Sequence, residues 1–257
     1  MSTNTLPEVD GDHRRLVRLH AVHNFRDMGG YPTVDGRSVR WRTLFRADGL
    51  QRLVGDDLEV VRALGLRTVI DLRTDAELTE RGRFPHEAHP VAFHHVPVID
   101  STAQMFDSPD AADPAAFLVG AYHDMLRRGP HRFVEAIEQL SRPDTLPAVF
   151  HCAAGKDRTG VLAMLLLGSL GVEHEYIVAD YALTNGGMER MRAWAEHESP
   201  EMSARLADTP PAFLSAHPEA MRRVIATICR DGSIRDFTLS LGVSPAALDR
   251  LTATLLE

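Results

Sequence analysis

Cysteine is nearly absent from this sequence: Cys152 and Cys229 are the only two among 257 residues. Two cysteines so far apart do not make the dense disulfide framework of small secreted domains, so that class is excluded. Glycine and proline, with 18 and 15 residues, are too few for a collagen-like or low-complexity chain. The sequence therefore belongs to an ordinary globular protein.

Long apolar runs are also missing. The longest, residues 161–172, is interrupted by Gly168, Ser169 and Gly171 and is too short to cross a bilayer. Residues 1–15 are polar and lack the apolar stretch of a signal peptide. We therefore expect a cytoplasmic protein with no integral membrane segment, although export without a leader would leave the same pattern.

Blocks of like charge are absent as well. The 28 Lys and Arg residues are outnumbered by 36 Asp and Glu residues, which gives a net charge of −8. This composition predicts no nucleic-acid partner, so a site for an anionic substrate must be a local pocket of positive potential. None of the 13 histidines has cysteine or paired carboxylate neighbours at metal-ligand spacing, and we expect no metal and no other cofactor.

The apolar pattern indicates strands that alternate with helices. Residues 68–72, 93–99 and 147–150 read as buried strands, and residues 114–128 and 130–141 read as helices from the spacing of their apolar positions. This order predicts an α/β fold with a central, mainly parallel sheet flanked by helices.

The chain reads as one domain. Residues 1–15 are expected to form a mobile tail and residues 16–257 a single domain, with a surface loop at 101–114. Residues 186–216 look like inserted helices that could form a lid over a pocket. Residues 217–256 are expected to contain three further helices separated by glycines.

The segment from Val149 to Gly160 carries the most chemical information. A buried strand leads to Cys152, five residues follow, and Arg158 directly precedes an apolar helix. Backbone N–H groups and the helix dipole make such a loop a cradle for an anion, and the planar guanidinium of Arg158 can hold two phosphate oxygens. The same positive field stabilises a thiolate, which is a nucleophile for phosphorus.

Other interpretations of this loop explain less. A cysteine that only fills the end of a strand would not account for Gly155 and Arg158 at this spacing. A Walker A loop needs glycine where Phe150 stands and Ser or Thr where Asp157 stands. A low-molecular-weight phosphatase or arsenate reductase would carry its cysteine loop close to the N-terminus.

The segment His151-Cys152-x-x-Gly155-Lys156-Asp157-Arg158-Thr159-Gly160 resembles the signature loop of the cysteine-dependent protein tyrosine phosphatases. It is most similar to the bacterial branch that includes secreted mycobacterial and listerial tyrosine and lipid phosphatases. The resemblance covers roughly residues 20–256. Further segments that match this branch are residues 24–31, 44–48, 70–73, 180–185 and 217–219.

This resemblance implies a parallel-sheet phosphatase fold with a helical lid and a role for each residue of the loop. Cys152 would form a phosphocysteine intermediate, Arg158 would stabilise the transition state, Thr159 would favour the thiolate as leaving group, and His151 would orient the loop. The residues expected to bind phosphate are Ala153, Ala154, Gly155, Lys156, Asp157 and Arg158.

Several aspartates are candidates for the general acid. The sequence has no Trp-Pro-Asp segment, and the bacterial branch implies Asp157, inside the loop, as the acid. Asp71, at the end of a predicted strand, is the second choice, and its other interpretation is a buried partner for an arginine. Asp100 and Asp124 are weaker candidates.

The substrate is also left open. We expect the substrate to be phosphotyrosine in proteins, with phosphoserine or phosphothreonine as further substrates. The sequence does not determine the oligomeric state. One alternative is a phosphoinositide phosphatase, suggested by a lysine at position 156 and disfavoured by the net charge of −8. Lys156 could equally be a solvated residue that only raises the local potential. Another alternative is a catalytically silent module that binds phosphoanions.

Overall fold

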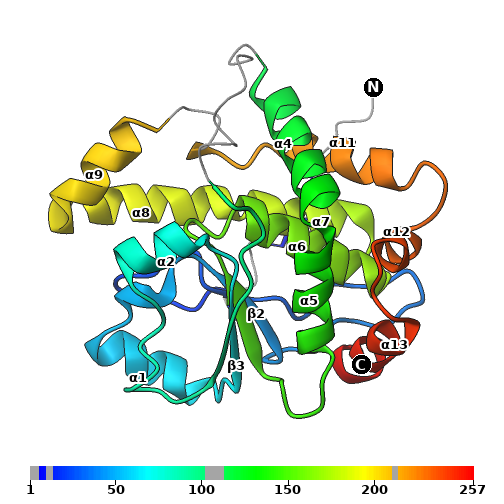
Figure 1. Cartoon of the computed structure of the whole chain (residues 1–257), viewed down its shortest axis with the longest axis horizontal. Coiled ribbons are helices and arrows are strands. Elements are labelled where there is room, and N and C mark those ends of the chain that lie inside the picture. Colours follow the sequence, from blue (N-terminus) through cyan, green and yellow to red (C-terminus); the bar gives the residue numbers. More distant parts are fainter. Residues whose placement is uncertain (1–5, 10–13, 102–112, 210–213) are drawn as a thin grey trace.

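The computed structural model describes residues 6–9, 14–101, 113–209 and 214–257. Within them, five strands form one sheet in the order β1-β2-β5-β3-β4 (Figure 1). The β1 strand is antiparallel to β2, and all other neighbours are parallel. The strands are β1 (Arg26–Asp27), β2 (Leu44–Ala47), β3 (Thr68–Asp71), β4 (Ala92–His95) and β5 (Ala148–His151). The expected α/β fold with a mainly parallel sheet is confirmed.

The β4 strand is shorter than the predicted 93–99. It ends at His95, and although Val96 still donates its N–H to the carbonyl of Asp71, Pro97 has no N–H to continue the ladder. The next amide, that of Val98, lies 3.5 Å from the carbonyl oxygen of Leu72. The chain therefore leaves the sheet at the level where β3 ends.

Two of the predicted helices have the expected bounds to within one residue, because proline and glycine mark where they begin and where the first of them ends. Pro114 and Pro130 occupy first-turn positions, where a missing N–H costs nothing, and Gly129 separates the two helices. The three C-terminal helices are also confirmed. The helical elements are η1 (Leu50–Arg52), α1 (Gly55–Ala63), α2 (Asp75–Arg81), α4 (Pro114–Arg128), α5 (Pro130–Leu140), α6 (Asp157–Ser169), α7 (His174–Ala182), α8 (Thr184–Glu198), α9 (Pro200–Ala207), α11 (Pro218–Ile228), α12 (Ile234–Ser240) and α13 (Pro245–Leu255).

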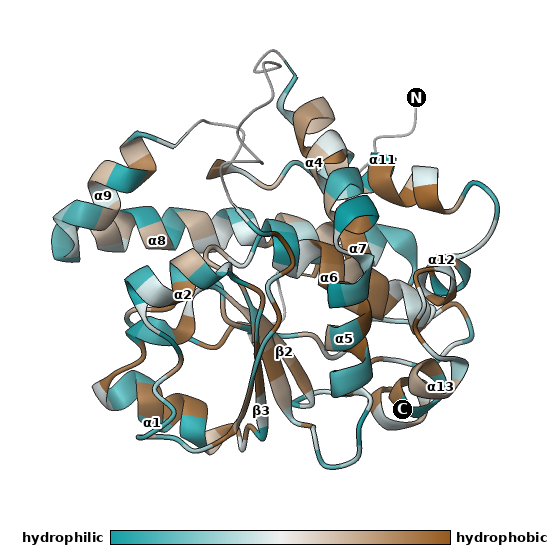
Figure 2. Ribbon diagram, in the orientation of Figure 1, coloured by the Kyte–Doolittle hydropathy of each residue, from teal (hydrophilic) through white to brown (hydrophobic). Residues whose placement is uncertain are grey.

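Each face of the sheet has its own apolar core. Successive side chains of a strand point to opposite faces. Val69 and Val149 therefore join the cluster under α1, whereas Ile70 and Phe150 join the larger cluster that contains α5 and α6. Figure 1 shows α1 and α2 on one side of the strands and α5 and α6 on the other. In Figure 2, brown apolar stripes alternate with teal polar ones on α1, α2 and α5.

The α6 helix is the central support of the larger core. All of its residues from Arg158 to Leu167 are buried, as expected for a helix that is apolar on every side. Because α6 follows β5, the middle strand of the sheet, its first turn lies at the centre of the molecule.

The segments at the edges of the predicted domain are only partly described. Within the predicted tail, Val9 and Arg15 are buried, and Arg15 donates a hydrogen bond to the carbonyl oxygen of Asp27 at 2.9 Å. Most of the predicted surface loop 101–114 lies outside the described residues. The predicted inserted helices correspond to α8 and α9, which extend over the carboxyl end of the sheet beyond α2 (Figure 1). None of the helices described is both long and apolar enough to span a membrane.

Candidate active site

Residues 152–158, here called the anion loop, join the carboxyl end of β5 to the first turn of α6. β5 is flanked by the parallel strands β2 and β3, and open parallel sheets bind ligands at the carboxyl ends of such strands. Cys152, the first residue of the loop, is only 2% exposed. Its thiol therefore lies at the base of the loop rather than on its rim.

Gly155 allows the loop to turn close to β2. Its φ of +67° lies in the left-handed region that residues with side chains rarely adopt. A Cβ at this position would lie 2.4 Å from the carbonyl oxygen of Ala47. The glycine in the motif is thus required by both backbone conformation and space.

Two side chains hold the carbonyl groups of the anion loop on its outer side. Asn24 donates its Nδ2–H to the carbonyl oxygens of Ala154 at 3.0 Å and Gly155 at 3.2 Å, and Arg46 donates to that of Gly155 at 2.7 Å. The C=O and N–H of a trans peptide point in opposite directions. The N–H groups of Gly155 and Lys156 are therefore turned toward the inside of the loop.

A buried charged cluster supports these two contacts. Asp180 accepts hydrogen bonds from Arg26 at 3.0 Å, from Arg46, and from the hydroxyl of Tyr31 at 2.9 Å. Burial alone would raise the pKa of Asp180, but the guanidinium groups of Arg26 and Arg46 outweigh burial and lower that pKa well below its ordinary value. Asp180 is therefore ionised and fixes both arginines.

Glu77 orients Arg158, and nothing in the sequence analysis assigned it a role. Its two carboxylate oxygens accept hydrogen bonds from Nη1 and Nη2 of Arg158 at 2.5 and 3.0 Å. Burial would raise the pKa of Glu77, but Arg158 lowers it to about 2. Glu77 also forms a capping box with Thr74 at the start of α2. That Thr-x-x-Glu pattern after a strand was the available signal, but it indicates a helix start and not a partner for Arg158.

Asp157 lies at the start of α6 and is held by two neighbours. The hydroxyl of Tyr122, on α4, donates to Oδ1 of Asp157 at 2.6 Å, and Nζ of Lys156 lies 3.5 Å from the same oxygen. The sequence predicts only that Tyr122 lies within the helix at 114–128. The structure brings its polar end to the anion loop.

Lys156 is buried and not solvated. Its side chain is fully buried, and its Nζ donates to the carbonyl oxygen of Ser215 at 3.1 Å. Burial lowers the pKa of Lys156, although nearby Asp157 and Cys152 raise it. The segment containing Ser215 is fixed in turn by Asn185, which exchanges two hydrogen bonds with the backbone of Ala216. The solvated alternative for this lysine is therefore wrong.

Asp71 is a buried ion-pair partner. It pairs with Arg73 through both oxygens, at 2.9 Å to Nε and 2.6 Å to Nη2, and both side chains are fully buried. Burial would raise the pKa of Asp71, but His151 and Arg73 lower it to about 2. His151 lies 3.6 Å from Asp71 and is itself buried, which lowers its own pKa. Asp71 is thus a carboxylate at neutral pH.

Thr159 follows Arg158 in α6 and is completely buried. Its Oγ1 has no hydrogen-bond partner among the residues that the structure describes. This hydroxyl is consequently free to donate to a charged atom at the anion loop, which is the role that the family resemblance implies for it toward the Cys152 thiolate.

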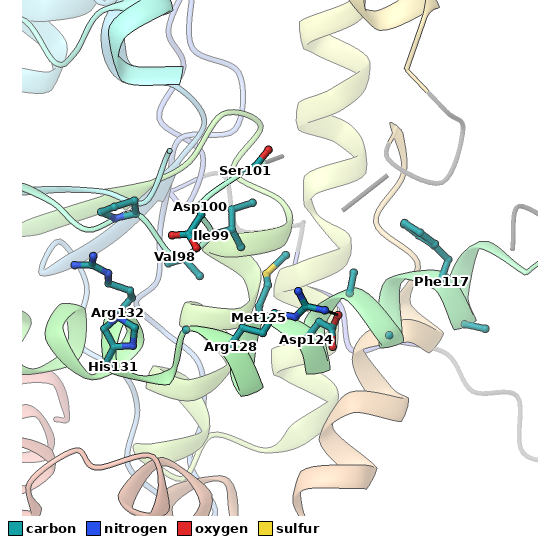
Figure 3. Close-up of a pocket in the computed structure, with 15 residues that line it drawn as sticks. Val98, Ile99, Asp100, Ser101, Phe117, Asp124, Met125, Arg128, His131 and Arg132 are labelled. Atoms are coloured by element: carbon teal, nitrogen blue, oxygen red, sulfur yellow. Dashed lines mark ion pairs between the residues drawn. The ribbon is translucent and has the colours of Figure 1, made fainter. Parts of the chain in front are cut away.

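The two weaker candidate acids line a separate cavity. About 490 Å³ in volume, it lies between the segment after β4 and the junction of α4 and α5 (Figure 3). Asp100 is on one wall of the cavity and Asp124 on the opposite one, near Met125 (Figure 3). Asp124 pairs with Arg127 at 2.8 Å and Arg128 at 3.3 Å, and is half exposed. Asp157 is the only one of the four carboxylates that belongs to the anion loop.

No group of three or more His, Cys, Asp or Glu side chains within the described parts of the chain is arranged to hold a metal ion.

Comparison with known proteins gives matches along nearly the whole chain. A sequence model of the "Tyrosine phosphatase family" matches residues 17–257. A candidate tyrosine-protein phosphatase of Cupriavidus necator is 36% identical over 69% of this chain, and the match spans 65% of that relative's length. The "Triple specificity protein phosphatase PtpB" of Mycobacterium tuberculosis is 28% identical over 93% of this chain and 98% of its own. Among solved structures, the Siw14 catalytic core covers 75% of this chain and 94% of its own at 13% identity, with a TM-score of 0.38.

Proposed function

Since this chain belongs to the tyrosine phosphatase family, we propose that it hydrolyses phosphotyrosine in proteins through a phosphocysteine intermediate. The observation that carries the proposal is the anion loop itself. Cys152 lies at the base of this loop, and the carbonyl groups of Ala154 and Gly155 accept hydrogen bonds on its outer side. Glu77 holds the guanidinium group of Arg158.

In the first step, the Cys152 thiolate attacks phosphorus, and the bond to the tyrosyl oxygen breaks. Arg158 and the inward N–H groups of the loop bind the non-bridging oxygens, where charge is distributed in the transition state. Asp157 gives its proton to the leaving oxygen. In the second step, Asp157 takes a proton from water as the water attacks the phosphocysteine, and phosphate leaves.

Asp157 is favoured over Asp71 as the acid. Asp71 is fully buried and held as a carboxylate by Arg73 through two hydrogen bonds, so it has no proton to give at neutral pH. Asp157 has a side chain that is 16% exposed, and it belongs to the same loop that would hold the phosphate. Asp71 then serves to fix the strand end and His151.

The substrate preference rests on the position of Lys156. The phosphoinositide alternative depends on this lysine reaching a lipid headgroup, and its Nζ is buried and bound to the carbonyl oxygen of Ser215. We therefore propose phosphotyrosine as the main substrate and a structural role for Lys156. Phosphoserine and phosphothreonine are proposed as slower substrates, because their alkoxide leaving groups need protonation more.

The test is phosphate release by the purified protein from a phosphotyrosine peptide, a phosphoserine peptide and phosphatidylinositol 3-phosphate, side by side. We expect release mainly from the phosphotyrosine peptide. Release mainly from the lipid would replace the proposed substrate by phosphoinositides. If no phosphate were released from any of the three substrates, the alternative of a catalytically silent module that binds phosphoanions would replace the proposal.

The matched control is Cys152→Ser. This variant should lose turnover, by roughly a thousandfold or more since the thiolate nucleophile is gone, and should still bind vanadate, because Arg158 and the loop amides remain. Turnover at the wild-type rate in this variant would contradict the phosphocysteine mechanism.

A further inference from the structure

Two helices that are distant in the sequence bring hydroxyl groups to the proposed general acid. Tyr122 comes from α4 and Tyr181 from α7, and their hydroxyl oxygens lie 2.6 Å apart. The two rings meet edge to face, with centroids separated by 6.1 Å. Both rings are buried, at 0% and 1% exposure. The pair reaches Asp157 at the start of α6 through the hydroxyl of Tyr122.

The position of Tyr181 depends on Gly160. A Cβ at Gly160, one turn after Asp157, would lie 3.0 Å from Cδ2 of Tyr181. The absence of a side chain there lets the ring of Tyr181 pack directly on the first turn of α6. The glycine that ends the signature motif thus makes room for the tyrosine pair.

The direction of the hydrogen bonds follows from counting protons. Burial raises the pKa of Tyr122 well above its ordinary value, and the charge of Asp157 raises it further, so its hydroxyl is protonated. Tyr122 has one hydroxyl proton, which it donates to Oδ1 of Asp157 at 2.6 Å. The bond between the two hydroxyls must therefore be donated by Tyr181 to Tyr122.

This arrangement makes the two oxygens of Asp157 different. Oδ1 faces Tyr122 and also lies 3.5 Å from the Nζ of Lys156, and both groups are donors. A proton on Oδ1 would oppose both of them. When Asp157 is protonated, the proton therefore resides on Oδ2.

We propose that Tyr122 is a positioning residue for the general acid: it binds Oδ1 of Asp157, so that Oδ2 carries the proton and presents it to the leaving oxygen. The inference rests on the proposed function, in which Asp157 is the acid. In the step itself, the Oδ2–H bond breaks and the proton goes to the bridging oxygen. The electron pair of the breaking P–O bond stays on that oxygen, and the new bond forms between phosphorus and Sγ of Cys152.

The experiment compares two aryl phosphates of similar size, phenyl phosphate and p-nitrophenyl phosphate. Nitrophenolate leaves without protonation, whereas phenolate, like the tyrosyl group with its pKa of about 10, needs the acid. The quantity measured is kcat/KM, which covers the steps up to loss of the leaving group. The readout is the ratio of the two kcat/KM values, because a general loss of structure would lower both together.

We expect Tyr122→Phe to lower kcat/KM for phenyl phosphate about tenfold, the typical effect of removing a hydrogen bond to a charged group. With p-nitrophenyl phosphate the change should be no more than about twofold, and vanadate should bind as in the wild type, because the anion loop is untouched. Equal losses on both substrates, or loss of vanadate binding, would assign Tyr122 a merely structural role and overturn the inference.

The variant Asp157→Asn separates a failure of the inference about Tyr122 from a failure of the assignment of Asp157 as the acid. Asp157→Asn should lower kcat/KM for phenyl phosphate by about a hundredfold or more, with a much smaller effect on p-nitrophenyl phosphate. An unchanged ratio in Asp157→Asn would remove Asp157 as the acid, and the inference with it. If the ratio of the two kcat/KM values changed in Asp157→Asn but not in Tyr122→Phe, the inference alone would be overturned. An inactive wild-type protein would overturn the proposed function.

Tyr181→Phe is the matched control within the same pair. It removes a buried hydroxyl from the neighbouring ring but leaves the bond between Tyr122 and Asp157. We expect it to leave the ratio for the two substrates within about twofold of the wild type, since it removes no bond to a charged group. A ratio changed as strongly as in Tyr122→Phe would show that packing of the pair, and not the bond to Asp157, is responsible, and would contradict the inference.

Discussion

At the scale of single residues, Glu77 fixes the guanidinium group of Arg158. The two form a bidentate pair with both side chains less than a tenth exposed. A long arginine side chain without a partner would sample many rotamers, and fixing it before the substrate arrives reduces the entropy cost of binding. Glu77 can do this because the capping box with Thr74 fixes its own position.

We predict that Glu77→Gln weakens vanadate binding and lowers kcat/KM for a phosphotyrosine peptide by roughly ten- to a hundredfold, because a hydrogen bond to a charged group is lost. Glu80→Gln, on the exposed side of the same α2 helix, is the control and should leave both unchanged. Vanadate titration with steady-state kinetics measures the effect. Equal vanadate affinities for the wild type and Glu77→Gln would show that Arg158 needs no orienting partner.

At the scale of elements, the anion loop owes its shape to the strands beside it. Asn24, just before β1, and Arg46, in β2, hold its carbonyl groups, and Gly155 passes within contact distance of the end of β2. The loop is therefore held firmly against the carboxyl end of the central strands. In the proposed reaction, these contacts would keep the N–H groups in place before the phosphoryl group arrives, so that no reorganisation is needed.

We predict that Gly155→Ala abolishes vanadate binding and lowers the free energy of unfolding by about 2–4 kcal/mol, the sum of a left-handed conformation and a displaced backbone contact. Gly65→Ala is matched in φ, at +68°, but has nothing within 4 Å of its added Cβ. It should cost only about 1–2 kcal/mol and leave turnover unchanged. Chemical denaturation and vanadate titration test both variants, and intact vanadate binding in Gly155→Ala would contradict the required close approach.

At the scale of the whole molecule, Asp180 joins β1, β2 and α7. Arg26 and Arg46 converge on its carboxylate, and all three side chains are at most 3% exposed. The contacts span more than 130 positions of sequence. Removal of a single carboxylate would leave two buried guanidinium groups without their counter-ion, which is much more costly than the loss of a surface pair.

We predict that Asp180→Asn lowers the free energy of unfolding at pH 7 by about 3–5 kcal/mol, because it breaks a buried ion cluster. Asp249→Asn, which breaks an exposed pair with Arg235, is the control and should change it far less. Urea denaturation measures both. A loss in Asp180→Asn no larger than in the control would show that the cluster contributes nothing to stability.

The stability that the buried, ion-paired carboxylates contribute depends on pH with a definite sign. The pKa values of Asp180, Asp71 and Glu77 are lowered in the folded protein, those of Asp71 and Glu77 to about 2. The folded state therefore binds fewer protons than the unfolded chain in acid. Stability from these groups is complete above about pH 5, where unfolded carboxylates are ionised, and is lost as the pH falls toward 2. Asp180→Asn should flatten this acid loss.

Much of the fold could be predicted from local patterns. The bounds of α4 and α5 follow from Pro114, Gly129 and Pro130, and the strands at 68–71 and 148–151 follow from buried apolar runs. The early end of β4 could have been anticipated at Pro97, which lacks an N–H. The order of the strands could not, because it depends on which apolar faces pack together and not on any single segment.

The sequence by itself determined the chemistry of the anion loop, because Cys152, Gly155 and Arg158 lie within seven consecutive residues and their spacing is set by the chain. Only the tertiary structure decided which distant groups serve them. Glu77 lies 81 positions from Arg158, and Tyr122 lies 35 from Asp157. Such pairs come together through the packing of α2 and α4 around the sheet, and packing energy depends on the whole core. A sequence motif therefore points to the proposed nucleophile, whereas the partners that orient Arg158 and Asp157 follow from the fold.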